Sequence, residues 1–160
     1  MTNYLCSAKR LCAVLLAAVL LCMLALPAGA ASSTKVGVSF WKEKSDKSAL
    51  PSDGVDAARE AALIRQANGT YTLELPVQSF SVMDVSGHIA GLSIGDITYD
   101  GELTGELENG TGLLTIKNLP ASVLTGSDPS KSLKVTCNLQ MDLNLLGVIN
   151  IDARMSVWAD

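Results

Sequence analysis

The sequence predicts a single all-β domain, a sandwich or a barrel, behind a secretory signal peptide. Apolar and polar residues alternate over most of the last thirty positions, as expected for half-buried strands. Short apolar segments elsewhere are separated by turn residues, and extended helical apolar stripes are nearly absent. The 160 residues carry a net charge of −4, which excludes a broadly basic nucleic-acid binder because phosphates attract clustered Lys and Arg.

Residues 1–30 are interpreted as the signal peptide. The basic pair Lys9-Arg10 precedes an apolar run, Leu11 to Leu26, and small residues then allow cleavage after Ala30. The run is shorter than the roughly 20 residues that span a bilayer. We therefore expect no transmembrane span in the mature form, and a protein that is secreted and in some settings surface-associated. Cys137 is the only cysteine left after cleavage, so no internal disulfide is expected.

The mature region, 31–160, is predicted to be one domain. Its first strand is marked by Val36, Val38 and Phe40, which alternate with smaller or more polar residues. Asn68-Gly69 then separates two short strands, and this pair tolerates positive φ at both central positions of a tight hairpin. Asn109-Gly110 predicts a second hairpin, between 103–107 and 113–116. Both asparagines also begin Asn-x-Thr sequences, and whether they are modified stays open.

The longest alternation, Ser132 to Val157, predicts a hairpin whose odd-numbered residues face the core. A three-residue loop, 145–147, lets the odd-numbered residues of both strands face the core, and it pairs Cys137 with Met155. Loop tips are normally polar, so the apolar side chains at this tip suggest a contact with a ligand, a partner or a neighbouring segment.

Two segments suggest helix. Residues 53–62 contain good helix formers with a weak apolar stripe, and 120–124 begins with a proline that suits the first helical turn. Residues 126–131 are predicted to be a polar loop.

Catalytic chemistry has few candidates, and we expect no enzymatic activity. His88 is the single histidine, and no Gly-x-Ser-x-Gly nucleophile motif accompanies it. The acidic residues between Asp96 and Glu108 fit the solvated face of a strand better than a calcium loop. Cys137 points into the predicted core, and no ligand pair has zinc spacing. Met83, Met141 and Met155 are placed at inward positions, where methionine usually fills core, although thioethers also hold haem iron.

Three segments carry a resemblance to a known family: Val36-Gly37-Val38-Ser39-Phe40-Trp41-Lys42, then Asp46-Lys47-Ser48-Ala49-Leu50, then Asn68-Gly69-Thr70-Tyr71-Thr72-Leu73. Together they resemble the near-iron-transporter (NEAT) family and the related surface haem-relay domains of Gram-positive bacteria. The resemblance implies an immunoglobulin-like β-sandwich of about eight strands, with one or two short helices. It also implies a haem-binding role, in haem or iron acquisition, with haem held between a short helix and the last hairpin.

Site residues follow from that resemblance. Members of the family often begin the short helix with Ser-Met, where this chain has Ser48-Ala49, and carry Tyr-x-x-x-Tyr in the last strand, where it has Asn150 to Arg154. The relay domains use methionine instead, which makes Met141 the candidate iron ligand. The candidate apolar contacts with haem are Leu50, Leu145, Leu146 and Val148. Haem, a haem protein and other surface proteins are the expected partners.

Two alternatives remain open. The segment from Asn68 to Leu75, followed by Ile94-Gly95-Asp96-Ile97, is similar to calycin-like secreted barrels, which bind small apolar ligands. The other alternative is an adhesive or interaction module that has no small ligand.

Overall fold

The computed structural model describes residues 32–142 and 147–159, which belong to one compact unit. The N-terminal segment 1–31 lies outside the described residues. In the described part, no helix is long and apolar enough to cross a membrane. The elements, in chain order, are β1 (Ser32–Lys42), η1 (Leu50–Gly54), β2 (Ala61–Arg65), β3 (Tyr71–Pro76), β4 (Phe80–Val82), β5 (Val85–Ile94), β6 (Ile97–Thr104), β7 (Leu113–Leu119), η2 (Ala121–Val123), η3 (Pro129–Lys131), β8 (Leu133–Met141) and β9 (Val148–Ala159).

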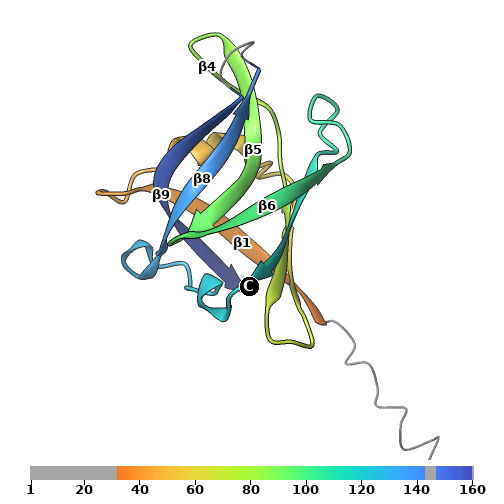
Figure 1. The fold of residues 1–160 in the computed structure, drawn as a ribbon, viewed down its shortest axis with the longest axis vertical. Coiled ribbons are helices and arrows are strands. Elements are labelled where there is room, and N and C mark those ends of the chain that lie inside the picture. The colour runs from red at the N-terminus through yellow and green to blue at the C-terminus, as the bar shows by residue number, and fades with distance from the viewer. Residues whose placement is uncertain (1–31, 143–146, 160) are drawn as a thin grey trace, which may run out of the picture. The chain divides into compact units, whose positions relative to one another are not determined.

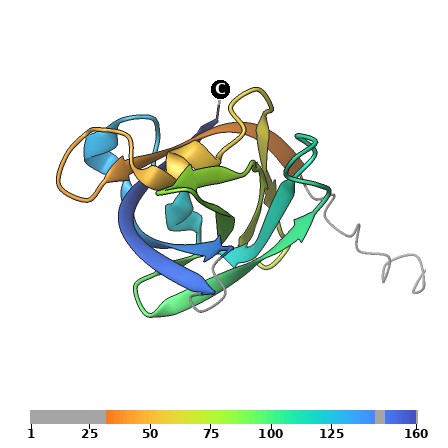
Figure 2. The same ribbon diagram turned by 90° about the horizontal axis from the view of Figure 1, so that it is seen from above.

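The all-β prediction is confirmed, and the described strands form one antiparallel sheet in the order β4-β5-β6-β7-β3-β2-β1-β9-β8 (Figure 1). A further pairing between β5 and β8 closes this sheet into a barrel, seen from above in Figure 2, and leaves β4 as a short extra strand beside β5. The strand order differs from that of an up-and-down calycin barrel, because β3 pairs with β7 and β5 pairs with β8.

The core lies inside the barrel and is built by the alternation seen in the sequence. Val135, Cys137 and Leu139 of β8 are buried, as are Met155 and Val157 of β9. Buried polar groups are few and paired; the Trp41 indole donates a 3.0 Å hydrogen bond to Ser156 Oγ. Among the described residues, every buried side-chain nitrogen and oxygen has a hydrogen-bond partner, so desolvation leaves no unpaired polar atom there.

The last hairpin has the predicted inward face but a different register. Cys137 pairs with Ile151 instead of Met155, and the Met141 N–H donates to the Gly147 carbonyl at 3.0 Å. The two arms are therefore bonded as far as Met141 and Gly147, so the predicted loop 145–147 is wrong. Alternation fixes only whether odd or even residues face inward, and a shift by an even number of residues leaves that face unchanged.

The Asn68-Gly69 turn is confirmed, with a conformation other than the one predicted. Gly69 has a φ of +83°, but Asn68 is absent from the residues with positive φ. The Gly69 N–H donates to the Gln66 carbonyl, and the Asn68 side chain accepts from the Thr70 N–H, both at 3.0 Å. The loop is thus a three-residue turn with a left-handed glycine at its end, in which the asparagine side chain stabilises the turn.

The second predicted hairpin is longer than expected. β6 ends at Thr104 and β7 begins at Leu113, so 103–107 is only partly strand. Gly105 and Gly110 both have positive φ, at +75° and +66°, and the glycine at each position admits a left-handed bend.

Other predictions need correction. Residues 53–62 are not a helix, because η1 ends at Gly54 and β2 begins at Ala61; the weak apolar stripe could not bury a helix face. The turn at 120–124 is confirmed as η2. Residues 126–131 contain η3, begun by Asp128, whose side chain accepts from the Ser130 N–H. Met83 does not face the core: it lies at the β4–β5 turn and is 93% exposed.

Candidate ligand-binding end of the barrel

The short helix η1 is held firmly against the barrel. Its Ser52 hydroxyl donates a 2.8 Å hydrogen bond to the Phe40 carbonyl of β1. A methyl group at Gly54 would lie 3.0 Å from Phe80 and 3.1 Å from Ile89, so the glycine allows close approach to β4 and β5. Leu50, at the start of the helix, packs half-buried against the core. The short helix implied at this position is therefore present, although Ser48 and Ala49 precede it.

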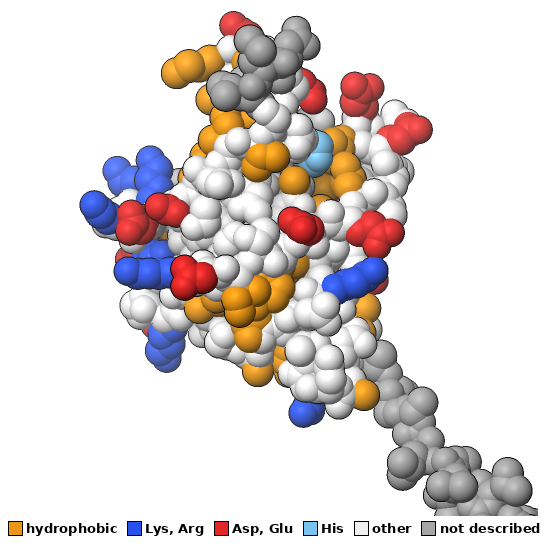
Figure 3. All heavy atoms as spheres, in the orientation of Figure 1, with side chains coloured by type: hydrophobic (Ala, Val, Ile, Leu, Met, Phe, Trp, Pro, Cys, Tyr) orange, Lys and Arg blue, Asp and Glu red, His pale blue; other side chains and the backbone are white. Residues whose placement is uncertain are grey.

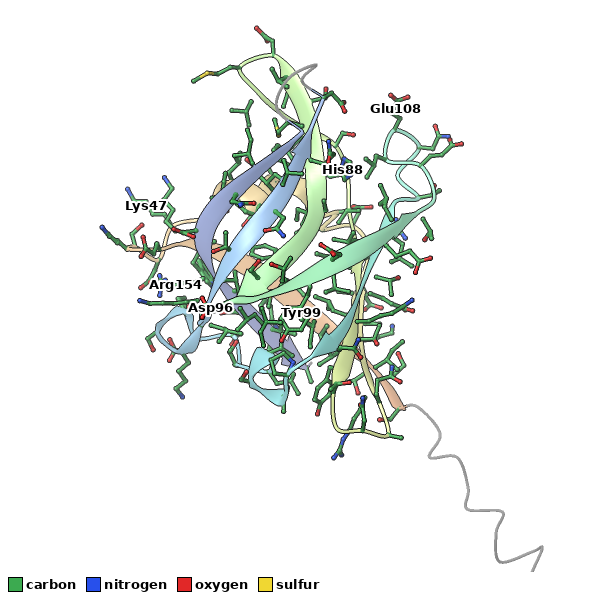
Figure 4. The ribbon with its side chains drawn as sticks, in the orientation of Figure 1. Lys47, His88, Asp96, Tyr99, Glu108 and Arg154 are labelled. Atoms are coloured by element: carbon green, nitrogen blue, oxygen red, sulfur yellow. The ribbon has the colours of Figure 1, made fainter. Side chains whose placement is uncertain are left out.

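Arg154 lies on the outer face of β9 and binds the segment of chain that leads into this helix (Figure 4). Its guanidinium donates to the carbonyls of Lys42, Ser45 and Pro129 at 3.1, 2.9 and 2.8 Å, and to Asp46 Oδ1 at 2.7 Å. The planar fork of an arginine suits several acceptors held in one plane. In the sequence, Arg154 stands where members of the NEAT family have the second tyrosine of Tyr-x-x-x-Tyr. Alternation placed it outward, but no local signal revealed its partners.

The loop held by Arg154 carries three lysines together with Glu43 and Asp46. Lys42, Lys44 and Lys47 are exposed, and Lys and Arg side chains gather on this side of the molecule in Figure 3. Acidic side chains lie among them in the same view, so the surface of this loop is of mixed charge.

The end of the β8–β9 hairpin exposes apolar side chains. Val148 is 56% exposed and Ile149 is 36% exposed. The β4–β5 turn extends beside this end, because Gly87 of β5 pairs with Met141 and the Asp142 N–H donates to the Ser86 carbonyl. Apolar side chains are visible at this end in Figure 3. Leu145 and Leu146, two of the predicted contacts, lie outside the described residues.

Met141 packs inside the barrel. It is 4% exposed, and its sulfur lies against Gly87, where any Cβ would collide with it. Met155 and Cys137 are also buried. Burial raises the pKa of the Cys137 thiol to about 12, so the thiol stays protonated and is a poor metal ligand. Met83 is thus the exposed thioether at this end, and its backbone has a φ of +49°.

His88 lies in a separate hollow of about 350 Å³ between β5 and the β6–β7 loop. Glu106, Glu108 and Asp142 line the same hollow, and Figure 4 shows His88 and Glu108 on the two sides. Burial lowers the pKa of His88, while the charge of Asp142 partly raises it. The sequence does not predict which residues lie near His88, because these neighbours come from loops that are distant in the chain. No described group of three or more His, Cys, Asp or Glu residues is arranged to hold a metal ion.

Comparison with solved structures identifies the fold. No family model and no curated protein matches the sequence. The fifth NEAT domain of IsdX2, a Bacillus anthracis hemophore, matches in its haem complex with a TM-score of 0.51 and 8% identity; the match covers 79% of this chain and 95% of that chain. A mutant of the same domain, also in complex with haem, matches at 0.51 and 8% over 79% and 94%. The chain has a NEAT-like fold.

The NEAT-like fold confirms the family resemblance at the level of architecture. The match spans nearly all of each NEAT chain. Identity this low transfers no ligand and no residue role.

Proposed function

We propose that this chain is a non-enzymatic NEAT-like binding module that is exported after cleavage behind Ala30 and takes haem at the end of the barrel formed by η1 and the β8–β9 hairpin. The observation that carries the proposal is the fold itself, shared with two haem complexes of one NEAT domain. Haem or iron acquisition is the process in which such a module would act.

The apolar and charged surroundings fit haem. Leu50 on η1 and Val148 on β9 offer aliphatic surface, which a porphyrin face requires. Leu145 and Leu146 are proposed to extend this surface. Lys44, exposed in the loop held by Arg154, would offer a positive charge to a porphyrin carboxylate, beside the acidic Glu43 and Asp46 of the same loop.

The iron ligand fits less well. Met141 is the donor proposed from the resemblance, and it is 4% exposed behind Gly87. It can reach an iron atom only if the end of the hairpin opens and the thioether leaves the core. Met83 is exposed on the neighbouring turn and needs no such opening. The two candidates therefore differ in which substitution, at Met141 or at Met83, should change the spectrum of the bound haem.

A second candidate function is an interaction module that binds no small ligand. The buried sulfur atoms favour it, and so does the outer face of the hairpin, which is polar. Thr136 there donates a 2.8 Å hydrogen bond to Asp152, and Asn138 lies opposite Asn150. A polar face of this kind suits a protein surface better than a porphyrin.

The test is a haem titration of the secreted protein and two matched variants, Met141→Leu and Met83→Leu. Each substitution conserves volume, and the buried one should cost less than about 1.5 kcal/mol of stability. The proposal expects a saturable Soret change in the wild type. A shifted Soret band and faster haem loss in Met141→Leu alone assigns the iron to Met141, whereas the same effect in Met83→Leu assigns it to the turn. Absence of any saturable change in the wild type refutes the haem proposal and leaves the interaction module.

A further inference from the structure

Met83 lies at the tip of the β4–β5 hairpin, at one end of the barrel (Figure 1). The two strands pair as far as Val82 opposite Val85, which leaves a turn of two residues, Met83 and Asp84. Both turn residues have positive φ, at +49° and +65°, as in a type I′ hairpin turn. Such turns favour Asn and Gly, so the backbone geometry does not account for a methionine at this position.

Packing does not account for Met83 either. Its side chain is 93% exposed, so it contributes nothing to the core. A large apolar side chain in an unfavourable backbone conformation, with no packing to stabilise it, indicates a role other than folding. Solvent reaches the thioether sulfur, and this atom is the reactive group of the side chain.

The other two methionines of the described chain are shielded. Met141 is 4% exposed, and its sulfur lies against Gly87. Met155 is fully buried, and so is the thiol of Cys137. Oxidants act on sulfur atoms that they can reach. The native fold therefore distinguishes one accessible methionine from two protected ones.

We propose that Met83 is a selective oxidation site for hydrogen peroxide and related peroxides, and that its oxidation changes the end of the barrel from apolar to polar. The sulfur lone pair attacks one peroxide oxygen, the O–O bond breaks and an S–O bond forms. The sulfur is oxidised to a sulfoxide, and hydrogen peroxide is reduced to water. A methionine sulfoxide reductase reverses the step: two thiols are oxidised to a disulfide and the oxygen leaves as water.

The fold tolerates this modification. The sulfoxide oxygen at Met83 accepts hydrogen bonds from water, because the side chain is exposed, so no polar group is buried. Oxidation of Met141 or Met155 would instead place a polar group in the core without a partner. Met83 is therefore the described methionine at which oxidation alters the surface without unfolding the domain.

The surface that changes is the apolar end shared with the β8–β9 hairpin. The Asp142 N–H donates to the Ser86 carbonyl at 2.9 Å, which holds the start of β5 beside the end of β8. Val148 and Ile149 of β9 are exposed at the same end. A sulfoxide at this end weakens the binding of an apolar ligand, because a polar group must then lose its water. The effect on haem rests on the proposed function, whereas the oxidation of Met83 does not.

The first test is oxidation of the secreted protein by dilute hydrogen peroxide, without haem, followed by peptide mapping with mass spectrometry. Met83 should gain one oxygen atom, and Met141 and Met155 should gain none until urea unfolds the protein. The oxidised protein should keep the urea midpoint of the untreated protein, because nothing packs on Met83. Resistance of Met83 in the native protein overturns the proposal, and so does oxygen uptake at Met141 or Met155 as fast as at Met83.

A second test measures the change in polarity. Once the peroxide has been removed, the oxidised wild type should elute earlier than untreated protein from a hydrophobic-interaction column. Sulfoxide reductase with a dithiol should restore the original elution. Peroxide should not change the elution of Met83→Leu, which controls for damage elsewhere in the chain. Unchanged elution of the oxidised wild type overturns the proposed change in polarity.

Haem titration of the same samples separates this proposal from the proposed function. If untreated protein binds haem, oxidation of Met83 should lower the apparent affinity about tenfold, because of the added desolvation, and peroxide should leave the affinity of Met83→Leu where it was. Equal affinity before and after oxidation of the wild type overturns the link between Met83 and the binding end. Untreated protein without a saturable Soret change refutes the haem proposal alone, and the peptide map and the elution still decide the oxidation of Met83.

Discussion

Truncation of Arg154 should loosen the loop that precedes η1 and destabilise the whole domain. The side chain is 14% exposed and donates to three backbone carbonyls as well as to Asp46. Hydrogen bonds from a charged group contribute about 1.5–3 kcal/mol each when both partners stay dry. The three carbonyls lie in surface loops that water reaches once the guanidinium is gone, so the combined cost lies well below that sum. We expect Arg154→Ala to lower the free energy of unfolding by about 2–3 kcal/mol.

Two further variants separate the contributions. Asp46 is 68% exposed, and an exposed ion pair contributes under about 1 kcal/mol, so Asp46→Ala should have a small effect. Arg154→Lys keeps the charge, but one ammonium group cannot reach three carbonyls at once. It should recover less than half of the loss.

Stability is measured by urea unfolding, with the m-value expected to be the same in all variants. Limited digestion with trypsin then reports on the loop itself. The loop carries Lys42, Lys44 and Lys47 as exposed cleavage sites, so Arg154→Ala should accelerate cleavage there. Lys134→Ala removes an exposed basic residue from β8 and serves as the control. If Arg154→Ala changes stability by less than about 0.5 kcal/mol and leaves the cleavage rate unchanged, the anchoring role assigned to Arg154 is wrong.

Other predictions can be checked with the same protein. Cys137 should react with thiol reagents only after unfolding, because burial raises its pKa to about 12; rapid labelling of the native protein would contradict the register of β8. Gly69→Val should cost about 1–2 kcal/mol, because Gly69 has a φ of +83°, and an unchanged urea midpoint would argue against the turn. Burial lowers the pKa of His88 from 6.5, so the unfolded chain binds the proton more readily and stability falls as pH drops below that value. His88→Gln should lose less stability than the wild type between pH 7 and pH 5, and equal losses would show that the histidine does not contribute.

Alternation of apolar and polar residues correctly predicted which side chains of the strands face the core. Alternation from Leu133 to Val157 correctly placed Cys137 and Met155 in the core, because a residue's side of a sheet depends on sequence parity alone. The same alternation could not choose between registers that differ by an even number of residues, so Cys137 was paired with Met155 instead of Ile151.

The remaining differences come from contacts between distant segments. Closure of the sheet depends on the pairing of β5 with β8, which no local pattern in either strand encodes. Met83 was placed inward from its apolar character, but it lies at a turn and is exposed. The helix expected over 53–62 had the propensity without the apolar face, and tertiary packing decided against it. Arg154 finds its partners in Lys42, Ser45 and Pro129, all more than twenty residues away in the chain.

The most direct measurement of the central claim is a backbone amide NMR titration of the secreted protein with gallium protoporphyrin, a diamagnetic analogue of haem. If the domain takes haem at the proposed end, saturable shifts should concentrate on Leu50 to Gly54 of η1 and on Val148 to Ile151 of β9, and the amides near Asn68 should be unaffected. No saturable shift would contradict the account, and so would shifts confined to the opposite end of the barrel.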